Sequence, residues 1–86
     1  MNSVTFVNPF DHWVHMVVRA GSEANCEANE VAFDASLGPG EKWSLSTDQN
    51  FVSYRRTVNP GDAAGPLGDW TTLSPDAIKS GAAIQL

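Results

Sequence analysis

Short apolar runs, separated by turn residues at intervals of roughly ten, are the feature that most limits what this chain can fold into. Gly, Pro, Asn and Asp fill the gaps, and no run has the length or spacing of a long amphipathic helix. This pattern predicts an all-β fold: a small antiparallel β-sandwich or partly open barrel of six or seven short strands. The predicted strands cover residues 4–7, 12–19, 31–35, 42–46, 51–58, 70–73 and 82–86.

Two other segments favour a short helical turn. Ser22 opens the polar stretch 22–30 and is a candidate N-cap, since serine side chains accept hydrogen bonds from the first turn of a helix. Ser74 followed by Pro75 gives a second start signal, and Gly81 ends that segment. We therefore expect one helical turn, near residues 22–30 or 74–80.

Strand alternation predicts which side chains share a face in the two longest runs. In the run 12–19 one face is apolar apart from His12 and the other is mixed, which is typical of a strand with a core side and a partly covered side. The core side of this run carries Val14, Met16 and Val18, and the other carries Trp13, His15, Val17 and Arg19. In the run 51–58, one side carries Val52, Tyr54 and Arg56, and the other carries Phe51, Ser53 and Arg55.

The length favours surface binding over a deep pocket. A chain of 86 residues is enough for a single domain, spanning 1–86, but leaves few residues to build the walls of a cavity. Cys26 is the only cysteine, so no internal disulfide is expected. The first residues lack the basic and apolar regions of a secretory signal. A cytoplasmic setting fits best, although a mature secreted form would have the same composition.

The charge is acidic and unevenly distributed. The formal net charge is −5, and residues 1–50 hold seven of the ten acids but only two of the five bases. Such a surface repels nucleic acid and anionic membranes, so we expect neither as a direct partner. A protein with a basic surface is the partner that electrostatics favours.

No constellation for catalysis or metal binding is visible. His12 and His15 are three residues apart, a spacing that places them on opposite sides of a strand. Cys26 lies beside Glu27, and a neighbouring carboxylate disfavours the reactive thiolate. We therefore expect no enzyme, no cofactor and no metal, while a small enzyme or enzyme subunit remains an alternative.

Aromatic and charged residues give the candidates for binding. Trp43 alternates with Leu45 and is assigned to the core, whereas Trp13 and Trp70 are candidates for surface contacts. Arg55 adjoins Arg56, and the simpler interpretation of these arginines and of Arg19 is structural ion pairing. The predicted binding residues are Trp13, Glu23, Glu27, Glu30, Asp34, Arg55 and Trp70.

The sequence favours non-enzymatic binding to a protein partner. A sharper alternative is a phage-type inhibitor, similar to anti-CRISPR proteins, whose acids occupy the basic groove of a host nucleic-acid-binding or defence complex. A second alternative is a carbohydrate-binding module that uses an exposed tryptophan. Exposed sheet edges also make a homodimer a reasonable expectation.

Overall fold

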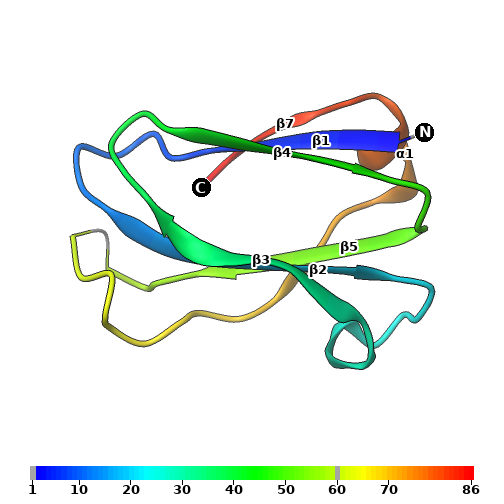
Figure 1. Ribbon diagram of the computed structural model, residues 1–86, viewed down its shortest axis with the longest axis horizontal. Coiled ribbons are helices and arrows are strands. Elements are labelled where there is room, and N and C mark those ends of the chain that lie inside the picture. The colour runs from blue at the N-terminus through cyan, green and yellow to red at the C-terminus, as the bar shows by residue number, and fades with distance from the viewer. Residues whose placement is uncertain (1, 60) are drawn as a thin grey trace.

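The computed structural model describes residues 2–59 and 61–86, which form two β-sheets with one short helix and one 3-10 turn (Figure 1). The all-β prediction is confirmed. The elements are β1 (Asn2–Val7), β2 (Val14–Gly21), η1 (Cys26–Ala28), β3 (Glu30–Leu37), β4 (Lys42–Thr47), β5 (Phe51–Arg56), β6 (Thr71–Thr72), α1 (Pro75–Lys79) and β7 (Ala83–Gln85).

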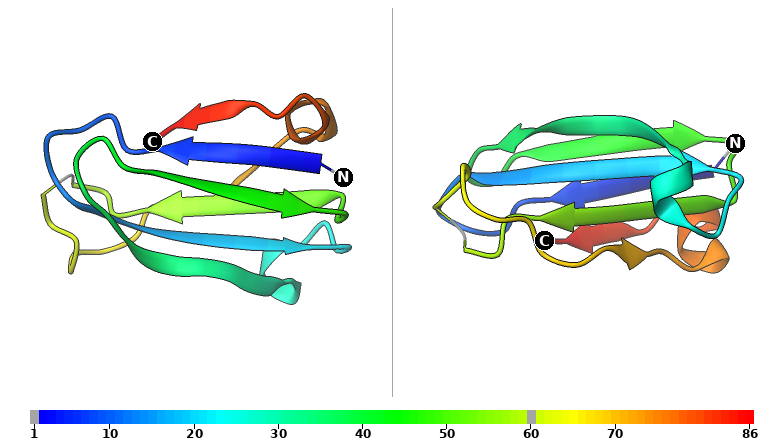
Figure 2. Two further views of the ribbon diagram at one scale, coloured as in Figure 1. Left: turned by 45° about the horizontal axis from the view of Figure 1, so that its top comes forward. Right: turned by 90° about the horizontal axis from the view of Figure 1, so that it is seen from below.

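The strands are divided between a three-stranded sheet A, in the order β4-β1-β7, and a four-stranded sheet B, in the order β3-β2-β5-β6. Figure 2 shows β1 flanked by β7 and β4, and β2 flanked by β5 and β3. Every described strand pair is antiparallel except β1 with β7, which is parallel. Alternation in the sequence does not report strand direction, so this one parallel pair was not foreseen.

The core lies between the two sheets and follows the predicted alternation. Val4 and Phe6 of β1 are fully buried and face Val14, Met16 and Val18 of β2. Each fully buried side chain of this size contributes about 1.5–3 kcal/mol of transfer free energy. These five residues therefore explain why the sheets pack with these faces inward.

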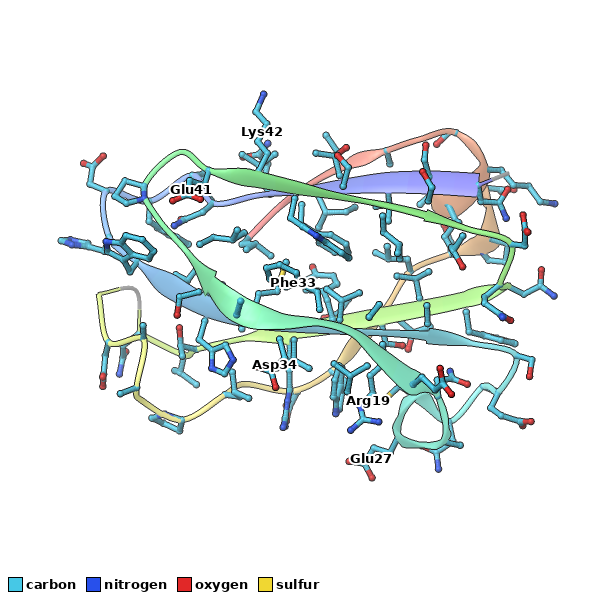
Figure 3. The ribbon with its side chains drawn as sticks, in the orientation of Figure 1. Arg19, Glu27, Phe33, Asp34, Glu41 and Lys42 are labelled. Atoms are coloured by element: carbon cyan, nitrogen blue, oxygen red, sulfur yellow. The ribbon has the colours of Figure 1, made fainter. Side chains whose placement is uncertain are left out.

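Aromatic contacts extend this core to β3 and β4, which are edge strands of their sheets. The ring of Phe6 lies 5.2 Å from Tyr54 and 6.2 Å from Trp43 between centroids. Phe33 of β3 contacts Trp43 of β4 at 4.5 Å, and Figure 3 shows Phe33 between the sheets. The assignment of Trp43 to the core is confirmed, since it packs against the buried cluster.

A buried asparagine holds together the loops at one end of the sandwich. The side chain of Asn8 is fully buried, and its Nδ2 donates to the main-chain oxygens of His12, Leu37 and Gly38 at 2.8–3.1 Å. Its Oδ1 accepts from the main-chain nitrogen of Phe10. One side chain thus satisfies main-chain groups of the β1–β2 and β3–β4 connections, which would otherwise be buried without partners.

A second buried asparagine organises the β2–β3 connection at the opposite end. Asn29 Oδ1 accepts from the main-chain nitrogen of Glu23, and Nδ2 donates to the oxygen of the same residue. The turn predicted over 22–30 exists as η1, but Ser22 does not cap it. Asn25 is the N-cap, and its side chain accepts from the nitrogen of Glu27. The start lies three residues later because the first part of the loop is held by Asn29 instead.

The helical start at Ser74 is confirmed. Its hydroxyl accepts from the nitrogen of Ala77, and Pro75 occupies the first turn of α1. Ile78 faces inward and is almost fully buried, so the helix closes one end of the core. None of the helices in 2–59 and 61–86 has the length and apolar character to cross a membrane.

Candidate binding face on the outside of sheet B

The outer face of sheet B is the side turned away from sheet A. Strand alternation places His15, Val17 and Arg19 of β2 there, beside Ser53 and Arg55 of β5. In Figure 3, Arg19 and Asp34 point away from sheet A, whereas Lys42 points outward on the opposite side of the sandwich. Val17 is buried although it lies on this outer face, so its long neighbours cover part of the sheet. The predicted partly covered side is therefore confirmed.

A β-bulge brings Trp70 onto this face. The main-chain N–H of Gly68 donates to the main-chain oxygen of Arg56, and Thr71 pairs with Tyr54. Between these two pairings, β5 contains one residue, Arg55. The segment opposite it contains two residues, Asp69 and Trp70. Two residues opposite one is the definition of a bulge, and bulges redirect side chains.

The bulge places the indole of Trp70 between two arginines that belong to different strands. The guanidinium carbon Cζ of Arg55 lies over the ring at 4.8 Å from its centroid, and Cζ of Arg19 lies at 5.7 Å. Arg19 is on β2 and is reached across β5, where the small, buried Ser53 pairs with it. Each such cation–π contact is worth about 0.5–1 kcal/mol at a partly exposed site. We call Arg19, Arg55 and Trp70 the Arg–Trp cluster.

The Arg–Trp cluster holds three buried N–H groups without acceptors. They are Nε of Arg19, Nε of Arg55 and Nε1 of Trp70, none of which has a hydrogen-bond partner among the described residues. Arg19 does donate through Nη1 to the main-chain oxygens of Asn29 and Glu27, at 2.7 and 3.4 Å. The side chain of Arg55 has no hydrogen bond and no ion pair within residues 2–59 and 61–86. The cluster is therefore rich in donors and short of acceptors.

The expected ion pairing of the arginines is wrong for residues 2–59 and 61–86. The sole ion pair found there joins His15 and Asp34 on the outer face of sheet B. Arg56 instead donates to the main-chain oxygens of Leu86, Thr57 and Val58, at 2.9, 2.6 and 3.3 Å. Main-chain oxygens thus take the place of carboxylates as acceptors for Arg56.

A hollow of about 360 Å³ lies at the edge of β5, beside the bulge. Trp70 and Arg19 are not among the residues that line it. Polar groups and apolar surface both contribute to its wall. The residues that line it are Tyr54, Arg55, Arg56, Val58, Gly68, Asp69, Thr71 and Leu86.

The structure brings most of the predicted binding residues to one region. Arg55 and Trp70 are in contact, and Asp34 is 56% exposed on the same face. The acids Glu23, Glu27 and Glu30 are exposed on the β2–β3 connection and the start of β3, and the carbonyl of Glu27 accepts from Arg19. They form an acidic rim at one end of the face.

Trp13 does not join this group. It is 54% exposed and lies just before β2, at the end of the sandwich where the β1–β2 and β3–β4 loops meet. Its ring lies against Gly38, since a Cβ atom on that glycine would be 3.2 Å from the indole. Trp13 was a candidate for surface contacts, and its role in binding stays a prediction.

Sequence reasoning missed Arg19 and Asp69 as members of the site. Alternation did place Arg19 and Arg55 on mixed faces, but it could not show that β2 and β5 are neighbours. Asp69 lies outside the predicted strands, and only the pairing register reveals the bulge.

No cluster of three or more His, Cys, Asp or Glu side chains suited to a metal occurs in the described ranges. Cys26 is a free, half-buried thiol in η1.

No protein-family model, curated protein or solved structure matches this chain. The site is therefore interpreted from its own geometry.

Proposed function

We propose that this protein acts by non-enzymatic binding to a protein partner through the outer face of sheet B. The observation that carries the proposal is the Arg–Trp cluster, whose three buried N–H donors lack acceptors in the described residues. A buried donor without a partner costs about 1–3 kcal/mol, and an acceptor from a bound protein would recover that cost. The cluster is thus both the proposed location of binding and a source of its favourable free energy.

The composition of the face supports a protein as the ligand. Tryptophan and arginine dominate interface hot spots, and such spots lie in partly desolvated centres surrounded by polar rims. Here Asp34 lies on the same face as the Arg–Trp cluster, and the acidic rim lies at one end of that face. A standard interface covers about 800 Å² per partner. That area is about one sixth of the 4746 Å² surface of this molecule, so one face is large enough.

The acidic rim supports a partner with basic groups. Glu23, Glu27 and Glu30 have no ionic partner within 2–59 and 61–86. Their uncompensated charge favours encounter with a cationic surface and raises the association rate. An inhibitor that occupies a basic groove would use the same acids.

Affinity capture tests the proposal. Tagged wild-type protein and the variants Arg55→Met and Trp70→Leu are used to capture proteins from the source cell, followed by mass spectrometry. Lys42→Met is the control, because it removes one cation from the outer face of sheet A. We expect a specific partner that is retained by Lys42→Met and lost with both face variants. A partner captured equally by all four proteins would refute this face as the binding site.

Trp13 supports a second candidate function, carbohydrate binding. Its ring is more than half exposed, and sugars stack on exposed indole faces. Trp70 is a poor platform for the same purpose because two guanidiniums already lie over it. A glycan array compares wild type with Trp13→Ala, and signals that persist in the variant would remove this candidate.

A further inference from the structure

We propose that the protein partner adds an extended strand to the free edge of β3, with Lys or Arg side chains on the outer face of sheet B. This inference rests on the proposed function and names how the partner would engage that face. Within the described ranges, β3 pairs with β2 on one side and with no strand on the other.

The edge of β3 is longer and less protected than the other three sheet edges. β3 has eight residues, whereas the edge strands β4, β6 and β7 have six, two and three. Short strands, lysines, prolines and bulges are the usual protections of a sheet edge. β3 contains no lysine or proline, and its bulge lies at Ala32, which the register with β2 skips. The segment 33–37 therefore stays in regular register beside an open edge.

Alternation along β2 shows which main-chain groups of β3 are free. The oxygen of His15 accepts a main-chain hydrogen bond from the residue that follows β5, so His15 is turned toward β5. Main-chain direction alternates along an antiparallel strand, so Met16 is turned toward β3, where Ala35 pairs with it. The main-chain N–H and C=O groups of the two neighbours of Ala35, Asp34 and Ser36, therefore point to the open edge.

The side chains of β3 favour a cationic strand. β3 carries Glu30 and Asp34 and no base, whereas β4, an edge strand of sheet A, carries Lys42 and no acid. Asp34 is exposed, its Oδ1 contacts His15, and its Oδ2 has no partner within 2–59 and 61–86. Opposite charges on neighbouring strands stabilise a pair, and like charges destabilise it. A second copy, with the same acids and a net charge of −5, is therefore a poorer occupant than a basic segment.

The inward side of the same edge is apolar and incompletely covered. Phe33 and Trp43 contact each other at 4.5 Å between ring centroids, and both are only partly buried. Ala35 is exposed although it pairs with the fully buried Met16. Figure 3 shows Phe33 between the sheets and Asp34 pointing away from sheet A. Because side chains alternate along a strand, the fitting segment has apolar residues on one side and Lys or Arg on the other.

The test is amide hydrogen exchange, followed residue by residue by NMR, with a capped peptide of alternating lysine and valine as the probe. In the free protein, we expect the amides of Asp34 and Ser36 to exchange rapidly and that of Ala35 slowly. At a peptide concentration about ten times its Kd, exchange at Asp34 and Ser36 should slow about tenfold, because about one molecule in eleven is free. This alternate-residue pattern is specific to an added strand.

Each of four results would overturn the inference. Protection at Ser44 and Ser46 instead would place the added strand on β4. An equal effect of a peptide with glutamate for lysine would exclude the charge preference, and equal binding of a peptide N-methylated at alternate residues would exclude main-chain pairing. Slow exchange at Asp34 and Ser36 that depends on protein concentration alone would identify a second copy as the occupant.

Proline variants separate the edge from the fold. Ser36→Pro removes an N–H that points to the open edge, so it blocks an added strand without removing a hydrogen bond to β2. Ser44→Pro is the matched control on β4, because its register partner Thr5 donates its own main-chain N–H to Ala82, on the far side of β1. We expect Ser36→Pro to abolish peptide binding and Ser44→Pro to retain it, with thermal unfolding confirming that both are folded.

A charge variant covers the case in which Ser36→Pro does not fold. Asp34→Lys should weaken binding of the lysine peptide by about threefold or more, whereas Asp11→Asn, in the β1–β2 loop, should change it by less than about twofold. Unchanged binding by Asp34→Lys would contradict the assignment to this edge.

The peptide titration and the capture experiment fail separately. If capture depends on Arg55 and Trp70 but the peptide protects neither Asp34 nor Ser36, the proposed function stands and the added strand is rejected. If the peptide binds β3 but Ser36→Pro retains the captured partner in full, the partner does not use this edge and the inference is overturned. Loss of the partner in Ser36→Pro, with retention in Ser44→Pro, supports it.

Discussion

The guanidinium of Arg55 lies over the indole of Trp70 at 4.8 Å from the ring centroid, at a bulge where Asp69 and Trp70 both lie opposite Arg55. Neither residue is in the core, and no carboxylate is ion-paired with Arg55 within 2–59 and 61–86. The contact therefore lies outside the core. Its contribution to the free energy of unfolding can be measured separately from that of core burial.

A double-mutant cycle between Arg55→Met and Trp70→Leu should give a coupling free energy of about 0.5–1 kcal/mol in urea unfolding. The reason is that each single variant removes the same cation–π contact. Arg55→Met combined with Trp13→Leu is the matched control, and it should be additive because Trp13 lies at the end of the sandwich. A coupling near zero for Arg55 and Trp70 would contradict the contact.

Salt should weaken partner binding steeply. The acidic rim is exposed, and attraction between exposed charges is screened as ionic strength rises. Between about 50 and 500 mM salt we expect affinity for a captured partner to fall by roughly tenfold or more, measured by calorimetry.

The salt dependence should be reduced in a Glu23→Gln, Glu27→Gln double variant, because two rim charges are removed. Asp11→Asn is the control, since Asp11 is an exposed acid in the β1–β2 loop, away from the rim. An affinity that stays flat across this range would reject an electrostatic role for the rim.

Asn8→Ala should lower the free energy of unfolding by about 2–4 kcal/mol, because it leaves several buried main-chain groups without partners. Urea denaturation measures the change. Asn50→Ala is the control, as Asn50 is exposed in the bend before β5, and its effect should be within about 0.5 kcal/mol. A loss below about 1 kcal/mol for Asn8→Ala would show that water replaces the side chain.

Much of the fold could be predicted because it follows from local patterns in the sequence. Alternation along 12–19 identified the inward face of β2, and the Ser74-Pro75 pair identified the start of α1. For 51–58, alternation separated the two faces of β5 without showing which one is inward. The start of η1 was misplaced at Ser22, since the side chain that orders that loop, Asn29, acts from several residues away.

For the candidate site, the sequence identified Arg55 and Trp70 as separate candidates but gave no reason to join them. Their contact depends on β6 pairing with β5 and on the bulge between those strands. It also depends on β2 lying next to β5, which brings Arg19 within reach of the same ring. Strand order is a long-range property that alternation does not encode.

The sequence by itself determined the all-β class, the inward face of β2, the acidic first half and the start of α1. These properties follow from local spacing and composition, which act within a few residues. Only the tertiary structure decided that Arg19, Arg55 and Trp70 meet, that the arginines take main-chain oxygens and an indole instead of carboxylates, and that a hollow lies at the edge of β5. The physical reason is that each of these features arises where strands distant in the chain pair in one register.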